Sequence, residues 1–293
     1  MLEFKNVTLE SAEILRPYLE SSINRLCDFS VGGIVMWRNA LHTQYALHDG
    51  VLYIKFNLQG GRTAFTVPLG KPFRETYKNL VEYCNSNWEK LVFAIVSADE
   101  KDEILNFFPE AEVSYERDYS DYIYVGEDLA TFKGKKYSGQ RNHVNRFQRE
   151  NDTWNFEEVS EANIHEIKAY FEKYNRENEK ESFTAVAERN GVREVLDNLG
   201  AYGFKGEALR VNGEIIGFFL CEAIYDTLIV HVEKCERGVN GAYQMLAREE
   251  AAKYCVGGLK YVNREDDSGD EGLRKSKLSY HPAFMGDKYT VTV

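Results

Sequence analysis

Acidic and basic side chains alternate in blocks within NREDDSGDEGLRKSK, residues 263–277, and their types suit acid–base and anion-binding chemistry. A carboxylate such as Glu265 or Asp266 can hold or deprotonate an amine, and the sequence leaves open which of the two does so. Arg274 and Lys277 lie three residues apart, so on a helix they can grip one phosphate or carboxylate together. These four are candidate catalytic residues. The alternative is a helix whose first acids and last bases stabilise its dipole.

A second segment, residues 132–150, is basic although the chain is acidic. It holds six Lys or Arg against one acid, a charge of +5, whereas the 293-residue chain carries −11. A solvated helix normally mixes both signs, so the excess favours an anion-binding helix starting near Ser138, with a merely solvated helix as the alternative. The candidate phosphate-binding residues here are Lys135, Lys136, Arg141, Asn142 and Arg146.

The stretch HVEKCERGVNGAYQML, residues 231–246, predicts a buried strand, a glycine-containing turn and a helix. The first N–H groups of a helix favour phosphate, so Arg237, Gly238 and Gly241 are further candidate phosphate ligands, unless this is an ordinary strand-to-helix turn. The matching turn in the first half contains Pro72, which lacks a backbone donor, so the second half is preferred. His231, on the apolar strand, is expected to be a core histidine with satisfied hydrogen bonds.

Several kinds of chemistry have no support in the sequence. The six His lack HExxH spacing and the five scattered Cys lack zinc spacing, so we expect no metal. There is no GxSxG motif and no P-loop. The simplest mechanism is therefore direct transfer, in which an activated ester or thioester lies beside an amine or hydroxyl and no covalent enzyme intermediate forms.

Charge and hydropathy limit the partners and the location. A net charge of −11 argues against a general nucleic-acid coat or a membrane-surface binder. No apolar run is long enough to span a bilayer, and MLEFKNVTLE lacks the apolar region of a signal peptide. An odd number of scattered cysteines is typical of reduced thiols. We therefore expect a cytoplasmic protein; the oligomeric state is left open.

The elements that position these segments are predicted to occur in the same order twice. Helix, hairpin, strand, helix, strand, helix and strand follow one another in each half, while the residue identities do not repeat. Asp49–Gly50 and Asn212–Gly213 mark the two hairpins, because both turn positions need positive φ. The pattern predicts an α+β protein with two domains, residues 1–130 and 131–293, of which the second carries the site.

Two stretches resemble a known family: DYIYVGEDLATFKGKKYSGQRNHVNRF, residues 121–147, and YVNREDDSGDEGLRKSKLSYHPAF, residues 261–284. Both are similar to the C-terminal catalytic domain of phosphatidylglycerol lysyltransferases and its stand-alone bacterial relatives. The resemblance implies two tandem acyltransferase-like (GNAT-like) domains, as in Fem-type aminoacyltransferases. It also implies acyl or aminoacyl transfer, with aminoacyl-tRNA as donor in the characterised branch. The chain departs from the lysyltransferases in having no transmembrane stretch.

Together these observations predict transfer of an acyl or aminoacyl group from a phosphate-bearing carrier to an acceptor, a lipid or a peptide, that the sequence does not identify. The carrier is tRNA or coenzyme A, whose phosphates would meet the basic segment. Acyl-CoA or aminoacyl-tRNA is then a donor substrate, and no tightly bound cofactor is expected. The alternative is a non-catalytic ligand-binding protein that retains the acyltransferase-like scaffold.

Overall fold

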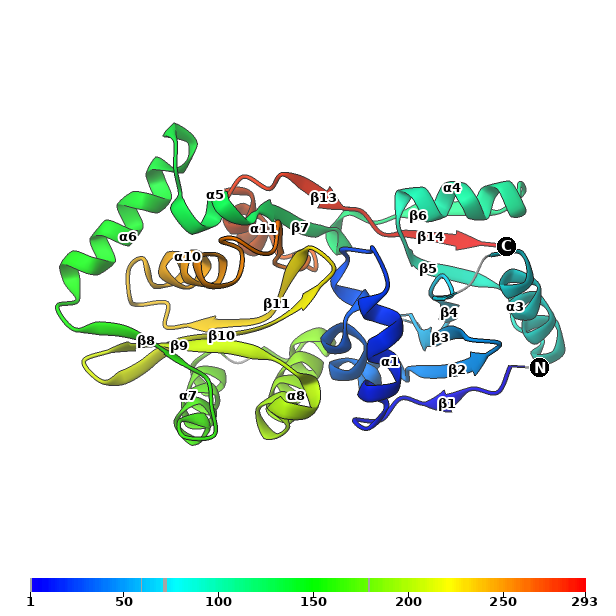
Figure 1. Ribbon diagram of the computed structural model, residues 1–293, viewed down its shortest axis with the longest axis horizontal. Coiled ribbons are helices and arrows are strands. Elements are labelled where there is room, and N and C mark those ends of the chain that lie inside the picture. Colours follow the sequence, from blue (N-terminus) through cyan, green and yellow to red (C-terminus); the bar gives the residue numbers. More distant parts are fainter. Residues whose placement is uncertain (1, 59, 71–72, 179) are drawn as a thin grey trace. The chain divides into compact units, whose positions relative to one another are not determined.

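The computed structural model describes residues 2–58, 60–70, 73–178 and 180–293, and of Phe73 the backbone alone (Figure 1). Pro72, which entered the comparison of the two strand-to-helix turns, lies outside the described residues. The chain forms two compact units. The first comprises Met1–Asp121 and Gly286–Val293, and the second comprises Tyr122–Met285.

The first unit is built on a seven-stranded mixed sheet in the order β1-β2-β3-β4-β5-β14-β6. Its strands are β1 (Lys5–Asn6), β2 (Gln44–His48), β3 (Val51–Asn57), β4 (Thr63–Phe65), β5 (Val92–Val96), β6 (Glu112–Tyr115) and β14 (Tyr289–Thr292). Its helices are α1 (Ser11–Glu20), α2 (Arg38–Leu41), α3 (Phe73–Asn87) and α4 (Ala98–Phe107). The hairpin of β2 and β3 turns at Asp49 and Gly50, which both have positive φ, as predicted.

The second unit repeats this architecture with the order β13-β7-β12-β11-β10-β9-β8. Its strands are β7 (Asp121–Val125), β8 (Trp154–Glu158), β9 (Lys205–Val211), β10 (Glu214–Ile224), β11 (Thr227–Cys235), β12 (Tyr261–Asn263) and β13 (Phe284–Gly286). Its helices are α5 (Gly126–Thr131), α6 (Ser138–Glu150), α7 (Ile164–Glu177), α8 (Phe183–Asp197), α9 (Leu199–Tyr202), α10 (Ala242–Tyr254) and α11 (Glu271–Leu278). Figure 1 shows α7 and α8 on one face of this sheet and α10 on the other.

Amphipathic helices and apolar strands explain the cores of both units. In α1 the buried residues Ala12, Leu15 and Leu19 recur at helical spacing, so one face packs inward. In the second unit α10 buries Met245 and Leu246 against the central strands β10 and β11, which are almost wholly apolar on that face. The predicted α+β fold, the repeated element order and the Asn212–Gly213 hairpin are thus all confirmed.

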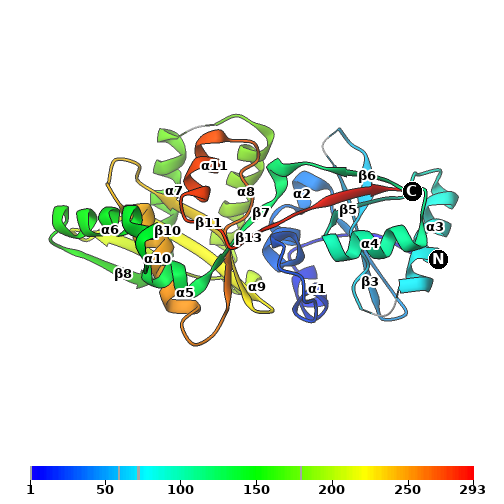
Figure 2. The ribbon, with the colours of Figure 1, turned by 90° about the horizontal axis from the view of Figure 1, so that it is seen from above.

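The last strand of each repeat is inserted into the sheet formed by the other repeat. After β6 the chain continues into β7, which lies between β12 and β13 in the second sheet. After β13 it continues into β14, which lies between β5 and β6 in the first sheet (Figure 2). The compact units therefore depart from the expected ranges 1–130 and 131–293, because strand pairing assigns residues 122–130 to the second unit and 286–293 to the first.

Candidate functional site

The site lies in the second unit, at the point where two parallel strands stop pairing with each other. β11 and β12 pair in parallel from Thr227 and Tyr261 to Ile229 and Asn263. Beyond this point β11 continues to Cys235, whereas β12 ends and a polar loop, residues 264–270, leads to α11. Loops that follow the carboxyl ends of parallel strands are frequent places for ligand sites in sheets that also carry helices.

A β-bulge turns His231 toward this loop. Leu220 on β10 faces Val232 and Cys221 faces Val230, so His231 is the extra residue on β11. A bulge bends its strand and re-aims a side chain, and bulges are frequent beside active sites. The imidazole is fully buried and stacks on Phe204, with ring centroids 5.1 Å apart and planes 9° from parallel.

His231 is held by two carboxylates. Its Nε2 lies 2.8 Å from Oε1 of Glu222, and its Nδ1 lies 2.7 Å from Oε1 of Glu265. Burial alone would lower the pKa of His231, but the hydrogen bonds to Glu222 and Glu265 outweigh it and raise this pKa to about 10. An imidazolium can donate from both nitrogens, so the geometry suits a protonated His231. The side chain of Glu222 is 7% exposed and that of Glu265 is 24% exposed, so Glu265 is the member that a substrate can reach.

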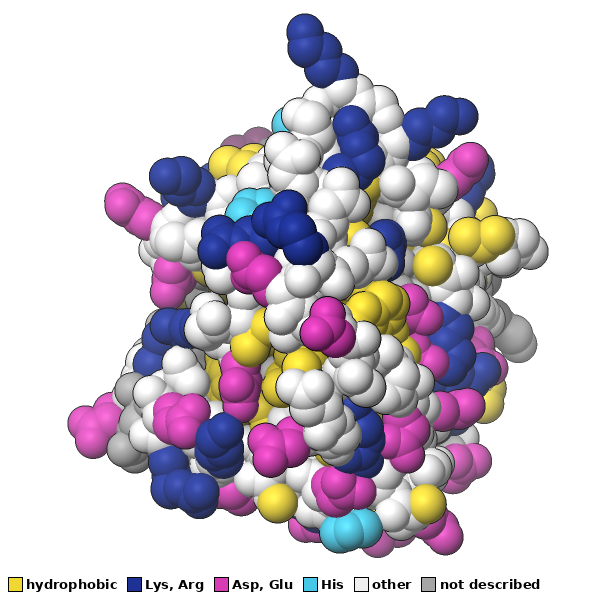
Figure 3. Space-filling view, turned by 90° about the vertical axis from the view of Figure 1, so that its left-hand side faces the viewer, with side chains coloured by type: hydrophobic (Ala, Val, Ile, Leu, Met, Phe, Trp, Pro, Cys, Tyr) yellow, Lys and Arg dark blue, Asp and Glu magenta, His cyan; other side chains and the backbone are white. Residues whose placement is uncertain are grey.

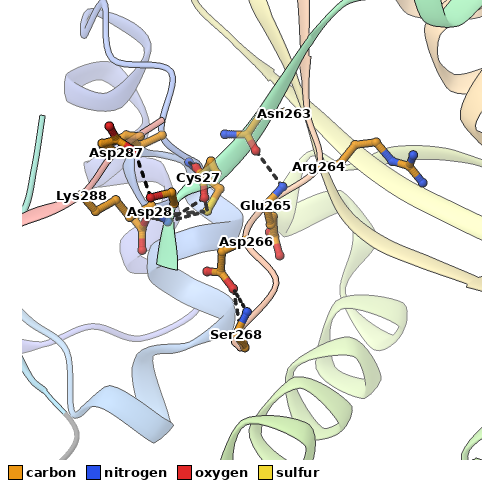
Figure 4. A network of polar contacts seen from close by, with 12 residues as sticks. Cys27, Asp28, Asn263, Arg264, Glu265, Asp266, Ser268, Asp287 and Lys288 are labelled. Atoms are coloured by element: carbon orange, nitrogen blue, oxygen red, sulfur yellow. Dashed lines mark hydrogen bonds and ion pairs between the residues drawn. The ribbon is translucent and has the colours of Figure 1, made fainter. Parts of the chain in front are cut away.

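The backbone of the loop is fixed by the buried Asn263 and the half-buried Lys277. Oδ1 of Asn263 accepts from the Glu265 N–H at 2.7 Å (Figure 4). The ammonium of Lys277 donates to the carbonyls of Arg264 at 2.6 Å and Glu265 at 3.2 Å, and also to that of Asp266. Glu265 has a φ of 55°, a conformation that costs free energy in a non-glycine residue and is frequent at functional sites. Lys277 therefore holds the loop in a conformation that it would not adopt alone.

Arg274 and Asp266 also make contacts inside the loop. The guanidinium of Arg274 donates to the fully buried carboxylate of Asp267 from Nε at 3.0 Å and from Nη2 at 2.7 Å. Burial opposes ionisation of Asp267, but the hydrogen bonds from Arg274 and Tyr122 outweigh it and lower the pKa of that carboxyl. Oδ1 of Asp266 accepts from the N–H and the hydroxyl of Ser268. The structure thus brings all four predicted catalytic residues into one assembly, in which Arg274 and Lys277 bind protein groups.

Arg264 points to the opposite side of the loop from Glu265 (Figure 4). Its guanidinium binds Glu233 of β11 and lies 3.5 Å from Glu250 of α10, which is fully buried. Burial and the neighbouring Glu233 raise the pKa of Glu250 well above its usual range, despite the opposing charge of Arg264. The guanidinium also lies 4.8 Å from the ring centre of Tyr280. Arg264 is therefore a largely enclosed structural charge, and it anchors the loop to α10 and β11.

The predicted glycine turn is only partly accessible. Gly241 is buried with a φ of 81°, and a Cβ there would lie 2.2 Å from the carbonyl oxygen of His143 in α6. The close approach of α6 explains the glycine without a ligand. Arg237 and Gly238 are exposed and line a cavity of about 270 Å³. The other lining residues are Tyr170, Lys173, Tyr174, Glu177, Asn178 and Glu236.

The basic segment forms α6 and the short turn before it, and the upper half of Figure 3 shows Lys and Arg gathered on this face. Three of the predicted phosphate ligands make local contacts. Arg141 donates to the carbonyls of Phe132 and Gly134, while Lys136 pairs with Asp128 and Arg146 with Glu150. By contrast, four exposed side chains make no hydrogen bond or ion pair within the described residues: Lys133, Lys135, Asn142 and Arg149.

A thiol and two carboxylates meet in the first unit, although cysteine and histidine spacing gave no sign of a metal group. Cys27, Asp28 and Asp121 offer ligand atoms within 4.8 Å of one another. The ammonium of Lys288 lies 2.6 Å from Asp28 and 2.7 Å from Asp121 (Figure 4). A lysine therefore supplies a positive charge to these carboxylates.

Sequence reasoning identified Glu265 but assigned no role to its partners. Glu222 was not singled out, and His231 was expected to be a core histidine. His231 is indeed buried with both nitrogens bonded, yet its partners lie 9 and 34 residues away in the chain. A glutamate and a histidine that interrupt the apolar runs of β10 and β11 were the signal available in the sequence.

Comparison with known proteins assigns the chain to a family. Residues 22–292 match the family described as phosphatidylglycerol lysyltransferase, C-terminal. A conserved protein of unknown function from Bacteroides thetaiotaomicron is 33% identical over the full length of both chains, with a TM-score of 0.92. An uncharacterized protein of Mycoplasmoides gallisepticum is 25% identical over 59% of this chain, and the chain spans about half of that protein, 56% of its length.

More distant solved structures share the fold. L-PGS from Bacillus licheniformis is 15% identical, with a TM-score of 0.66 over 96% of this chain and 91% of that one. FemX is 8% identical, with a TM-score of 0.58 over 98% of this chain and 96% of that one. No helix in the described residues is long and apolar enough to cross a membrane. The chain belongs to the phosphatidylglycerol lysyltransferase C-terminal family, and its two mixed sheets are tandem acyltransferase-like domains.

Proposed function

We propose that this protein transfers an aminoacyl or acyl group directly from a phosphate-bearing carrier to an acceptor, with Glu265 as the general base. Family and fold indicate an aminoacyl or acyl transferase. The observation that carries the proposal is the partly exposed carboxylate of Glu265, which is bound to the buried His231 at the bulge of β11 against β10. A general base must be held in place and must be within reach of the substrate, and the bond to His231 together with the partial exposure of Glu265 meets both requirements.

Glu265 is better suited to this role than Asp266. Burial raises the pKa of Glu265, although the hydrogen bond from His231 opposes that shift. A raised pKa lies closer to neutral pH, where a carboxylate is most effective as a general base. Asp266 has an oxygen bonded to the backbone and hydroxyl of Ser268, which gives it a structural contact. Arg274 and Lys277 then act as positioning residues that hold the loop.

The proposed step balances without a covalent enzyme intermediate. The nitrogen or oxygen of the acceptor forms a bond to the carbonyl carbon of the donor ester or thioester, and its proton passes to the Glu265 carboxylate. The bond from that carbon to the carrier breaks, and the carrier leaves as a hydroxyl or thiol after it takes this proton from Glu265, which returns to the carboxylate form. Alignment of the two substrates supplies much of the rate enhancement in such a direct transfer.

The exposed cations of the second unit are the proposed contacts for the phosphates of the donor. Lys135 and Asn142 keep their predicted role, with Lys133 and Arg149 beside them, and Arg237 and Gly238 offer a second position. Arg141 acts by holding the carbonyls of Phe132 and Gly134. Aminoacyl-tRNA and acyl-CoA both carry such phosphates, and a lipid or a peptide is the proposed acceptor class.

The test is transfer of label by the unmodified protein. Radiolabelled aminoacyl-tRNA and acetyl-CoA are supplied separately with a bacterial lipid extract and a peptide fraction, and the reaction is stopped early for mass spectrometry of the protein. We expect label in one acceptor fraction and no acylated enzyme. A trapped acyl-cysteine would contradict direct transfer. Saturable donor binding without transfer to either fraction would favour the non-catalytic alternative.

Charge reversal tests the donor surface separately. Lys135→Glu with Arg149→Glu should weaken donor binding and flatten its dependence on salt, because fewer counterions are then released. Lys78→Glu with Lys90→Glu makes the same change of charge at exposed positions of the first unit and should leave binding unchanged. Equal weakening by both pairs would mean that only net charge matters.

A further inference from the structure

The first unit contains a cavity that the transfer chemistry above does not use. It has a volume of about 500 Å³, and its lining includes residues where β2 begins, β3 ends and β4 begins. Volumes of this size are typical of small-molecule sites. The lining residues are Asn6, Val7, Arg38, Asn39, His42, Thr43, Gln44, Lys55, Asn57 and Thr63.

The lining of this cavity contains basic and neutral polar residues but no acidic residue. Two of its residues are Arg or Lys, one is His, six are amides or hydroxyls, and none is Asp or Glu, in a chain that has 47 acids and only 36 Lys and Arg. A solvated surface of such a chain would normally mix both signs. A concave surface with one sign of charge concentrates ligands of the opposite sign. The cavity is therefore suited to an anion.

Lys55 gives the cavity a fixed positive charge. Its ammonium donates to the hydroxyl of Tyr83 at 2.8 Å and lies 4.9 Å and 5.2 Å from the ring centres of Phe4 and Tyr83. Aromatic rings hold a cation without neutralising it. Lys55 makes no salt bridge within the described residues, so its charge remains available to a ligand.

The neutral groups add directional donors around this charge. Asn39, Asn57 and Thr63 line the cavity and make no side-chain hydrogen bond within the described part of the chain. The remaining two amides of the lining bind each other, because Gln44 donates to Asn6 at 2.8 Å. Amides and hydroxyls of this kind bind ligand hydroxyls, while lysine and arginine bind phosphate.

We propose that this cavity binds a small phosphomonoester that carries hydroxyl groups, of the size of a sugar phosphate. The basic residues would hold the phosphate dianion, and Asn39, Asn57 and Thr63 would bind the hydroxyls. This proposal concerns the first unit alone and stands whether or not the second unit catalyses transfer.

The test measures binding of ribose 5-phosphate to the full chain by isothermal titration calorimetry. Asn57→Asp is isosteric and adds a negative charge to the cavity, so repulsion of the phosphate dianion should weaken binding roughly tenfold or more. Lys55→Gln should act in the same direction. Asn106→Asp makes the same change at an exposed position of α4 outside the cavity and should leave binding unchanged.

Two further arms separate the sources of phosphate. Ribose should bind far more weakly than ribose 5-phosphate, and vesicles that contain an anionic phospholipid should not compete with it. No binding of ribose 5-phosphate, or equal binding by Asn57→Asp and the unmodified protein, would overturn the proposal. Binding to the vesicles alone would also overturn it, because the cavity would then take a lipid headgroup.

Discussion

The turn after β5 and the turn after β12 hold the same place in the two repeats, yet they are built differently. β5 ends at Val96, and Ser97 at once caps α4, with the Glu100 carboxylate accepting from the Ser97 N–H at 2.9 Å. β12 is followed by the longer loop 264–270 before Asp270 caps α11 through the Leu273 N–H. The first turn uses its acid to begin a helix, and the second places Glu265 beside a buried histidine.

The difference shows how two copies of one scaffold can place an acid in different surroundings at the same turn. The capping box in the first copy satisfies the free N–H groups at the start of a helix, which is a purely structural role. In the second copy the extra residues require outside support, which Asn263, Lys277 and Arg274 supply. Polar groups buried around a strained loop are the expected accompaniment of a functional site.

Removal of residues 286–293 should have the largest effect, because it takes β14 out of the first sheet. β5 and β6 would lose their shared partner, and the buried Asp121 would lose Lys288. We expect cooperative unfolding of the first unit to disappear in thermal scans followed by circular dichroism. Thr290→Ser retains the strand and should unfold like the unmodified protein. An unchanged transition in the shortened chain would show that the repeats do not depend on the exchanged strand.

Arg264→Met should destabilise the second unit by about 3–5 kcal/mol, because it leaves the half-buried Glu233 and the fully buried Glu250 without their cationic partner. The measurement is the free energy of unfolding in urea. Adding Glu233→Gln should recover part of the loss, since the unpaired charge is then removed. Arg237→Met, at an exposed position, should change stability by less than about 0.5 kcal/mol. Equal effects at positions 264 and 237 would contradict the anchoring role of Arg264.

The third effect, a smaller one, is the dependence of the free energy of unfolding on pH that His231 gives to the second copy. The folded pKa of His231 is raised to about 10, so its stabilising effect is present below its unfolded pKa of about 6.5 and is lost as pH rises toward 10. Between pH 6.5 and 9 we expect a loss on the order of 2–3 kcal/mol that His231→Gln abolishes. His165→Gln, at an exposed position, should retain the loss. Identical pH profiles for all three proteins would show that His231 is not protonated in the folded state.

Local signals in the sequence predicted much of the fold. Asp49–Gly50 and Asn212–Gly213 fix hairpins because few other pairs tolerate positive φ twice, and the helix expected near Ser138 is α6. The exchanged strands β7 and β14 could not be predicted, because a strand's composition does not say which sheet it joins.

The site was predictable by composition but not by geometry. The segment 263–277 contains Glu265 and the residues that hold its loop, so charge density pointed to the segment that the structure gathers into one polar assembly. The structural roles of Gly241 and Arg141 depend on contacts that residue spacing in the sequence does not reveal. Gly241 is a glycine because α6 packs against it, and Arg141 binds backbone carbonyls nine and seven residues before it.

The most direct test of the account compares the transfer rates of Glu265→Gln and Glu100→Gln, each measured per folded molecule with the donor that the unmodified protein uses. Glu265→Gln should lower the rate by about 10²–10⁴-fold with little change in the free energy of unfolding, because a general base is lost. Glu100→Gln should lower stability by about 1 kcal/mol through the helix cap and leave the rate unchanged. A Glu265→Gln variant that transfers at the unmodified rate would contradict the account.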